Sequence, residues 1–308
     1  MSERTQLITP RDETYDLRVG RATILAGADR GLYPAVNSLL LQGRDETLLI
    51  DPGVTLVAAG GISERVDRVL NSHGHEDHVA GNCLFDDAHF HAHEADVQAI
   101  RNLDGLMEIY GMGAAADAEF RETVLDEFSY VARPDASGFE HGDVFDVGDS
   151  TLTVVHLPGH TRGHCGFLIE PESVMYVADI DLTGFGPYYG DAWSDLDDFE
   201  ASIEACKTID ADLFVTAHHK FVVEGREQFR ERITEYQAII DRRDQALLEM
   251  LAEPKTLDQI ADHRFIYRPH VELGWVHEAE SRSAAMHLAR LVPNGAVTEI
   301  EPGIYRAG

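Results

Sequence analysis

Basic residues are scarce in this sequence of 308 residues. It has 25 Lys and Arg residues against 55 Asp and Glu residues, a formal net charge of -30, and its only lysines are Lys207, Lys220 and Lys255. Surfaces that bind nucleic acid or anionic lipid need clustered basic side chains, which the sequence lacks. We therefore expect neither nucleic acid nor membrane as a partner. The acidity is typical of proteins from high-salt habitats and equally of acidic proteins from GC-rich genomes.

Cysteines and long apolar runs are also scarce. The three cysteines, Cys83, Cys165 and Cys206, are widely spaced and odd in number, so they predict reduced thiols and no disulfide framework. No run approaches the roughly 18 apolar residues that span a bilayer. The first residues lack the basic and then apolar pattern of a secretory signal. These absences together predict a cytoplasmic protein.

The sequence does contain many short apolar segments, within a composition that is 44% hydrophobic and 26% charged and so typical of a globular protein. In the first half they are bounded by Gly, Pro and Asp, as strands and hairpins are. They are residues 21–27, 36–43 and 47–53. Four more carry His or Asp at or near their ends, namely residues 69–73, 150–160, 173–179 and 212–220. Strand ends that all deliver ionisable residues predict one site at one edge of a sheet.

Helical spacing occurs between and after these strands. Residues 199–209 have a good N-cap in Ser194 or Asp195. The predicted helices are residues 63–68, 93–101, 103–128, 199–209, 228–251, 256–261 and 278–291. The sequence becomes predominantly helical near residue 225, so we expect a catalytic α/β domain of residues 1–225 and a helical domain of residues 226–308. The second domain would end in a hairpin that turns at Asn294 and Gly295.

The densest group of metal-ligand residue types follows the strand of residues 69–73. It reads His73-Gly-His75-Glu-Asp77-His78, in which only Gly74 is not ionisable, and folding alone gives no reason for it. Imidazole and carboxylate suit zinc, manganese or iron. In an extended turn the first two histidines converge on one ion, and Asp77 and His78 then point to a second position.

This group resembles the H-x-H-x-D-H signature of the metallo-β-lactamase superfamily, and later segments resemble that superfamily's motifs in the same order. LPGHTRGH, residues 157–164, is similar to its P-G-H-T strand end and contains His160. Asp179 is similar to its bridging carboxylate, and His218 to its closing histidine. The resemblance covers roughly residues 18–225. It implies an αββα sandwich, followed here by a C-terminal helical, winged-helix-like domain.

The resemblance also implies a dinuclear metal-dependent hydrolase. The implied ligands are His73, His75 and His160 for one ion, Asp77, His78 and His218 for the other, and Asp179 as the bridge. The expected cofactors are two divalent ions, zinc first, with manganese or iron as alternatives. A hydroxide that bridges them would attack a small ester-like substrate such as a thioester or lactone, while Asp77 orients the water or accepts its proton.

Several nearby residues compete for these roles. Asp181 lies two residues beyond Asp179, and His219 adjoins His218, but the motifs favour Asp179 and His218. We expect His164 to be structural. The histidines that alternate along one strand, and that we expect at the surface, are His89, His91 and His93.

Members of the superfamily catalyse different reactions, and this sequence departs from some of them. Lactonases carry Tyr three residues after the bridging Asp, where this chain has Leu182. Glyoxalase II proteins bind glutathione with basic residues of a C-terminal region that is acidic here, and a charge of -30 disfavours the polyanionic substrates of the nuclease branch. The alternative from another class is a mononuclear iron oxidoreductase similar to persulfide dioxygenases, which needs only His73 or His75, His160 and Asp179.

Two further segments are candidates for the walls of the site. The segment of residues 103–128 has hinge-like Gly111 and Gly113, which fits a lid over the site and equally a packed outer helix. Its apolar residues are Leu106, Met107, Ile109, Tyr110 and Met112. In the C-terminal region, acidic residues stand where a winged helix would touch DNA: Glu272, Glu278, Glu280, Glu299 and Glu301. We therefore expect this region to form a homodimer or to wall the active site, with residues 263–268 at the pocket mouth.

Overall fold

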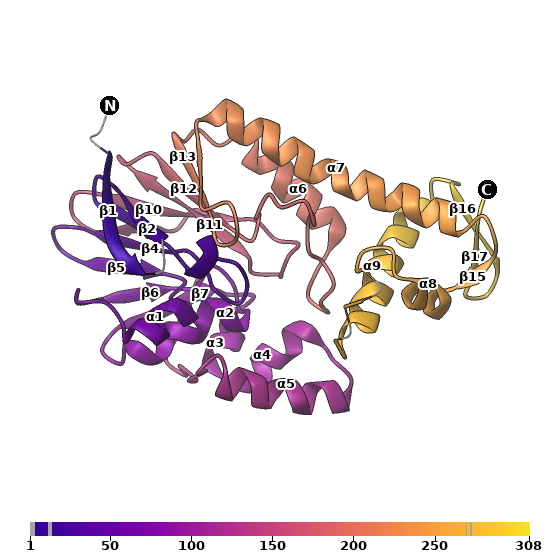
Figure 1. Ribbon diagram of the computed structural model, residues 1–308, viewed down its shortest axis with the longest axis horizontal. Helices are drawn as coiled ribbons and strands as arrows, with labels where there is room; N and C mark the ends of the chain where they lie inside the picture. Colours follow the sequence, from indigo (N-terminus) through magenta and orange to yellow (C-terminus); the bar gives the residue numbers. More distant parts are fainter. Residues whose placement is uncertain (1–3, 12–13, 269, 272) are drawn as a thin grey trace.

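Two β-sheets packed face to face form the centre of the molecule (Figure 1). The computed structural model describes residues 4–11, 14–268, 270–271 and 273–308. Strands of the first sheet follow sequence order, antiparallel from β1 to β5 and parallel from β5 to β8. They are β1 (Arg4–Arg11), β2 (Thr14–Val19), β3 (Ala22–Leu25), β4 (Ser38–Gln42), β5 (Thr47–Ile50), β6 (Arg68–Leu70), β7 (His89–His93) and β8 (Ser137–Phe139).

The second sheet has the order β14-β13-β12-β11-β10-β9. Only β12 and β13 run parallel, and the other neighbours are antiparallel. Its strands are β9 (Val144–Asp146), β10 (Thr151–His156), β11 (Cys165–Glu170), β12 (Val174–Ala178), β13 (Leu213–Thr216) and β14 (Val222–Glu224). Strands are therefore present at all seven apolar segments for which the sequence predicts them.

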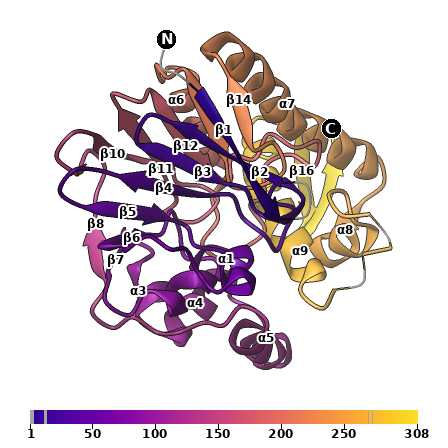
Figure 2. The same ribbon diagram turned by 60° about the vertical axis from the view of Figure 1, so that its left-hand side comes forward.

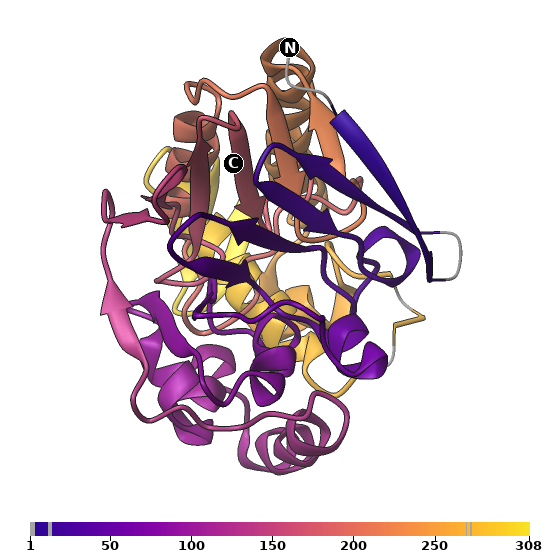
Figure 3. The same ribbon diagram turned by 90° about the vertical axis from the view of Figure 1, so that its left-hand side faces the viewer.

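Helices cover the outer face of each sheet, which makes the architecture an αββα sandwich (Figure 3). The first sheet is covered by α1 (Val54–Ala59), α2 (Glu76–Val79), α3 (Val97–Arg101), α4 (Leu103–Tyr110) and α5 (Ala114–Asp126). The second is covered by α6 (Leu196–Cys206) and the start of α7 (Arg226–Met250). Asp195 caps α6, accepting hydrogen bonds from the backbone of Asp197 and Asp198, as its position in the sequence predicts.

Side-chain alternation along the strands explains the four layers. In β4, Leu39 and Leu41 lie in the core between the sheets, whereas Leu40 packs among the helices of the first layer. In β12, Tyr176 faces the other sheet and Met175 faces the second helical layer. Successive strand residues point to opposite faces, so strands buried on both sides are apolar throughout.

The C-terminal region has its own small core and is joined to the sandwich by α7 (Figures 1 and 2). Phe229 and Ile233 of α7 pack with the second sheet's helical layer, whereas Leu247 packs in the C-terminal core. The remaining elements are β15 (Lys255–Thr256), α8 (Leu257–His263), α9 (Val276–Leu291), β16 (Val297–Glu301) and β17 (Ile304–Ala307), with the sheet order β15-β17-β16. No helix in the described ranges has the length and apolarity that a membrane span requires.

The prediction of a helix at residues 63–68 is wrong. The helix lies earlier, at α1, and ends at Gly60, whose left-handed φ of 76° lets its backbone N–H reach the carbonyls of Leu56 and Val57. Residues 63–67 instead lead into β6 without forming a helix. Asp67 pairs with Thr47 through the backbone at 2.9 Å and through its side chain at 2.9 Å, which aligns this segment with β5.

The predicted hairpin turn at Asn294 and Gly295 is also misplaced. Those residues join α9 to β16, and the hairpin of β16 and β17 turns at Pro302 and Gly303. Gly303 has a φ of 76°, and its N–H donates to Glu299 Oε1 at 2.7 Å. Both dipeptides are good turn formers, and the pairing of the strands decides which one closes the hairpin.

Candidate metal centre

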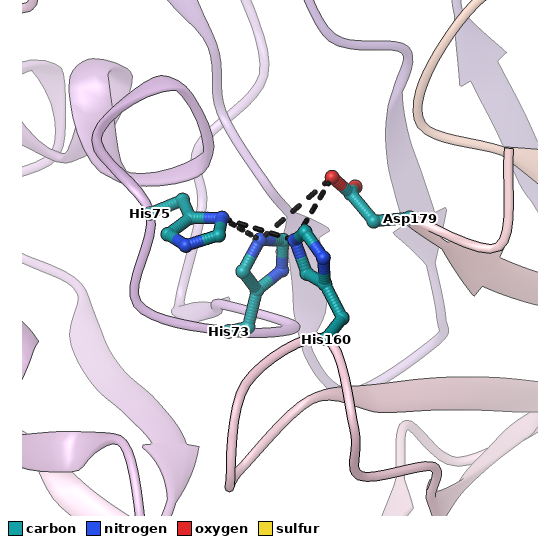
Figure 4. Close-up of side chains that lie close together, drawn as sticks. All are labelled: His73, His75, His160 and Asp179. Carbon is teal, nitrogen blue, oxygen red and sulfur yellow. Dashed lines mark hydrogen bonds and ion pairs between the residues drawn. The ribbon is translucent and has the colours of Figure 1, made fainter. Parts of the chain in front are cut away.

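Four segments that follow strands bring the predicted ligands together at one edge of the sandwich. His73 follows β6, and the neighbouring motif residues continue into α2, while His160, Asp179 and His218 follow β10, β12 and β13. Figure 4 shows His73, His75 and His160 with their rings turned toward one another and toward the Asp179 carboxylate. All seven predicted residues fall in two groups of potential metal ligands. Six of them are buried, and the Asp179 side chain is nearly buried.

The first group consists of His73, His75, His160 and Asp179. His75 Nδ1 lies 3.0 Å from the Nε2 atoms of both His73 and His160, and Asp179 Oδ2 lies 3.3 Å from His160 Nε2. Ligand atoms held about 2.0–2.1 Å from a tetrahedral zinc ion are roughly 3.3 Å apart. His73 Nε2 and Asp179 Oδ2 are farther apart, at 4.0 Å, and the three nitrogens and one oxygen together fit such an ion.

The second group consists of Asp77, His78 and His218, with Asp179 beside it. His78 Nε2 lies 3.0 Å from Asp179 Oδ1, and His218 Nε2 lies 3.2 Å from Asp77 Oδ2 and 3.6 Å from Asp179 Oδ2. Within the described chain, His78 Nε2 and Asp179 Oδ1 are buried and have no hydrogen-bond partner. Unsatisfied buried atoms of ligand type that face one another also fit a cation.

Each histidine is oriented by a hydrogen bond on the ring nitrogen that faces away from the centre. The pairs are His73 Nδ1 with Ser72 Oγ at 3.0 Å, His75 Nε2 with Asp191 Oδ2 at 3.0 Å, His78 Nδ1 with Asp51 Oδ2 at 2.9 Å, His160 Nδ1 with the Tyr188 carbonyl at 3.0 Å, and His218 Nδ1 with the Gly31 carbonyl at 2.9 Å. Such partners fix the tautomer and direct the other nitrogen of each ring at a metal.

The electrostatics also favour bound cations. Burial lowers the pKa of His73, so this ring is neutral, which is the form that binds metal. Burial raises the pKa of Asp179, but the surrounding histidines outweigh it and hold that pKa well below its usual value. Burial lowers the pKa of His78, yet Asp179 and Asp77 outweigh burial and raise it well above 6.5. The carboxylates thus attract positive charge to the space between the groups.

The competing residues lie outside both groups. Asp181 accepts hydrogen bonds from Thr183, and burial raises its pKa to about 6. His219 lines the cavity beside His218 without joining a ligand group. His164 donates through Nδ1 to a carbonyl and accepts at Nε2 from the Asp179 N–H at 3.1 Å, so it holds Asp179 in place. The β7 histidines, His89, His91 and His93, belong to neither ligand group.

Sequence reasoning missed two carboxylates that support the ligands. Asp51 accepts from Ser72 N at 2.7 Å, Ser72 Oγ at 2.6 Å, His78 Nδ1 at 2.9 Å and Tyr176 Oη at 2.9 Å. It follows β5 directly, which is the same pattern that identified the ligands, so the sequence did contain a signal. Asp191 accepts from His75 Nε2 and from Tyr188 Oη, and its position in a loop gave no such signal.

A cavity of about 370 Å³ opens onto the ligands. Tyr110, Met112 and Phe120 of the 103–128 segment line it, whereas Met107 is buried in the core, so this segment is both pocket wall and packed layer. The C-terminal region contributes Tyr267, Leu273, Trp275, Ala279 and Arg282. Tyr267 belongs to residues 263–268, so that run does reach the pocket.

Buried contacts hold the C-terminal wall in place. Glu280 is fully buried, and its carboxylate accepts from the backbone N–H groups of Phe265, Ile266 and Tyr267 at 3.1, 3.1 and 2.6 Å. Glu278 accepts from Gly113 N at 3.0 Å. These two acidic residues therefore have structural partners, whereas the sequence suggested that they form a surface that repels DNA. Glu272 lies outside the described residues.

Comparisons with known proteins agree with this geometry. The family model described as the metallo-beta-lactamase superfamily matches residues 33–218. A hydroxyacylglutathione hydrolase of Methylococcus capsulatus is 28% identical over 208 residues, 64% of this chain and 70% of that protein. The acyl-coenzyme A thioesterase MBLAC2 of Homo sapiens is 24% identical over 169 residues, 48% of this chain and 59% of that protein.

Solved structures also resemble almost the whole chain. A metallo-beta-lactamase family protein of Thermus thermophilus has a TM-score of 0.65 and 22% identity over 99% of this chain and 98% of that one. Because the match extends over both the sandwich and the C-terminal region, the two parts occur together in that fold as well.

Proposed function

Since the chain belongs to the metallo-beta-lactamase superfamily, we propose that it is a dinuclear metal-dependent hydrolase that cleaves small thioesters. The observation that carries the dinuclear proposal is Asp179, which belongs to the first ligand group through Oδ2 near His160 and lies beside the second with Oδ1 3.0 Å from His78 Nε2. The thioester proposal is supported by the two relatives above, whose names describe a hydrolase of an acylated glutathione and a thioesterase of acyl-coenzyme A.

Two bound divalent ions would supply an activated water and polarise the substrate carbonyl. The protein's own residues do the rest. Asp77 lines the cavity next to His218, and its carboxylate is the acceptor that we assign for the proton of the attacking water. Asp191 and Asp51 hold His75 and His78 in orientation, and the aromatic walls exclude bulk water.

The second ligand group also supports hydrolysis over the mononuclear iron alternative. A persulfide dioxygenase-like site needs only the first group, whereas here Asp77, His78 and His218 are buried and converge as well. A buried group of this kind is costly unless a cation offsets its charge.

Metal analysis tests the proposal most directly. Protein purified without added metal is expected to contain two zinc or manganese ions per chain and to hydrolyse an acyl thioester, with activity lost to a chelator and restored by either metal. One iron per chain together with oxygen uptake would contradict it and support the oxidoreductase alternative.

Two neighbouring carboxylates provide a matched pair of variants. Asp179→Asn is expected to lose metal and at least about a hundred-fold in kcat, because it removes a ligand of both ions. Asp181→Asn also lies in the cavity wall but in neither ligand group, and it is expected to keep both ions. Metal loss in Asp181→Asn with none in Asp179→Asn would reverse the assignment of the bridge.

A further inference from the structure

The charges around the cavity are one-sided. Among the described residues that line it, the only Lys or Arg side chain is Arg282, whereas the carboxylates are Glu76, Asp77, Asp179, Asp181 and Asp191. The two proposed ions would offset the charges of Asp77 and Asp179, which leaves Glu76, Asp181 and Asp191 against Arg282. Arg282 donates through its two terminal nitrogens to the carbonyls of Gly190 and Gly111. This guanidinium is therefore engaged in holding the wall, and its charge is partly offset by Glu278, whose Oε2 lies 3.9 Å from Arg282 Nη2.

The walls themselves are aromatic and continue outward to solvent. Phe185, Tyr267 and Trp275 form a chain of rings, with centroids 5.4 Å apart for the first pair and 5.6 Å for the second. Among the cavity residues, Tyr33, Phe185 and Leu273 are 54%, 41% and 51% exposed, which is high for large apolar side chains. Exposed apolar surface that leads into a cavity favours binding of an apolar ligand that covers it and removes it from water.

The whole chain adds to this bias. Its formal charge of -30 produces a potential that repels anions, most strongly at low ionic strength. A ligand with an anionic carrier would therefore approach against the field and find no unengaged Lys or Arg among the described lining residues.

We infer that the pocket takes thioesters with an apolar acyl group on an uncharged thiol, and that it discriminates against the same acyl group on an anionic thiol such as glutathione or coenzyme A. The inference rests on the proposed thioesterase function for its chemistry. The selectivity itself is a property of the pocket, so it can be measured without any turnover.

Binding of two hydrolysis-inert thioethers tests the selectivity separately from the reaction. S-hexyl-N-acetylcysteamine and S-hexylglutathione share the hexyl group and differ in the charge of the thiol part. By calorimetry at low salt the neutral probe is expected to bind at least about ten-fold more tightly, and added salt is expected to narrow the difference. Equal or tighter binding of S-hexylglutathione overturns the inference, and so does a failure of both probes to bind.

Hydrolysis of the matching hexanoyl thioesters then separates the two proposals. If the neutral probe binds selectively but neither thioester is hydrolysed, the proposed function fails and the inferred selectivity stands. If both thioesters are hydrolysed with equal kcat/KM, the function stands and the selectivity fails.

A charge added at the pocket mouth provides the sharpest variant. Leu273→Lys adds a cation and removes apolar surface at the cavity rim, so it is expected to raise the affinity for S-hexylglutathione relative to that for the neutral probe about three-fold or more. Leu125→Lys is the control, because Leu125 is 49% exposed and does not line the cavity. No gain in Leu273→Lys, or an equal gain in Leu125→Lys, would show that the pocket mouth does not set the selectivity.

Discussion

The sandwich and the C-terminal region border the same cavity but are built on different principles. In the sandwich, each candidate ligand histidine lies in a segment that follows a strand and has its outer nitrogen fixed by its own hydrogen bond. The C-terminal wall has no such repeated pattern, and Tyr267 is held in place through Glu280 of a different element. The reaction centre and the far wall of its pocket therefore lie on separate parts of the chain, and substitutions should be able to alter one without the other.

The largest expected effect is on the reaction centre. His160→Ala removes a nitrogen that lies 3.0 Å from His75 Nδ1, so it is expected to lose an ion and at least about a hundred-fold in kcat. Trp275→Ala is the matched change in the other region and is expected to keep the metal content while weakening substrate binding. Metal analysis and steady-state kinetics measure both. Full metal occupancy and activity in His160→Ala would mean that the site is assigned wrongly.

The next effect concerns the anchor of the C-terminal wall. Glu280→Ala leaves three backbone N–H groups without an acceptor, which is expected to cost about 3 kcal/mol or more of unfolding free energy. Because Tyr267 is released from the pocket, KM should rise with little change in metal content. Glu278→Ala, which removes a single N–H acceptor at a more accessible site, should cost less. Urea unfolding measures the change in stability, and steady-state kinetics measures KM. An unchanged KM in Glu280→Ala would show that Glu280 does not position the pocket wall.

His91 in β7 is expected to lower the stability of the fold in acid. Burial, with Arg68 beside it, lowers the pKa of His91 to about 4. The unfolded chain, with a His pKa of about 6.5, therefore binds more protons, so unfolding free energy falls as pH drops from about 6.5 to about 4. His91→Phe should reduce this fall in unfolding free energy by about 1–2 kcal/mol, a value that allows for the partial exposure of the His91 side chain. Urea unfolding of chelator-treated protein across that range measures it, and parallel slopes for wild type and variant would contradict it.

The smallest effects compare one helix cap from each region. Asp195 caps α6 through two backbone N–H groups, and Thr256 caps α8 in a capping box with Gln259. Replacing either cap with Ala is expected to cost about 1 kcal/mol of unfolding free energy. Urea unfolding measures this cost, and metal analysis should find wild-type metal content in both variants. A loss of metal in Thr256→Ala would show that the two regions are less separable than the geometry indicates.

The position of the candidate ligands could be predicted from the sequence because they lie in segments that follow recognisable strands, and the family resemblance then implied which residues of those segments are ligands. Asp179 directly follows the apolar run of β12, and His73 lies three residues past β6, so a local pattern places them at the sheet edge. The four layers follow from the same apolar runs. Asp191 supports the centre equally well but lies in an irregular loop, and only the tertiary fold brings it to His75.

The C-terminal wall could not be predicted in this way. In the sequence Glu280 looks like a surface charge. Its side chain is buried because it accepts hydrogen bonds from three backbone N–H groups of another segment, and the sequence does not reveal those contacts. The misplaced hairpin has a similar origin, since Asn294-Gly295 and Pro302-Gly303 are equally good turns and strand pairing selects the second. Side chains whose role depends on packing rather than on a strand end carry no mark in the sequence.

The long helix α7 has a consequence for how such proteins can be recombined. It has 25 residues and so spans about 37 Å. Its N-terminal part supplies Phe229, Ile233 and Ile240 to the sandwich, and Leu247 belongs to the C-terminal core. A chimera joined at residue 225 would strip this cover from the second sheet and leave an apolar face open to aggregation. A junction inside α7, between Ile240 and Leu247, would exchange the pocket wall and leave the sandwich that carries the metal ligands covered.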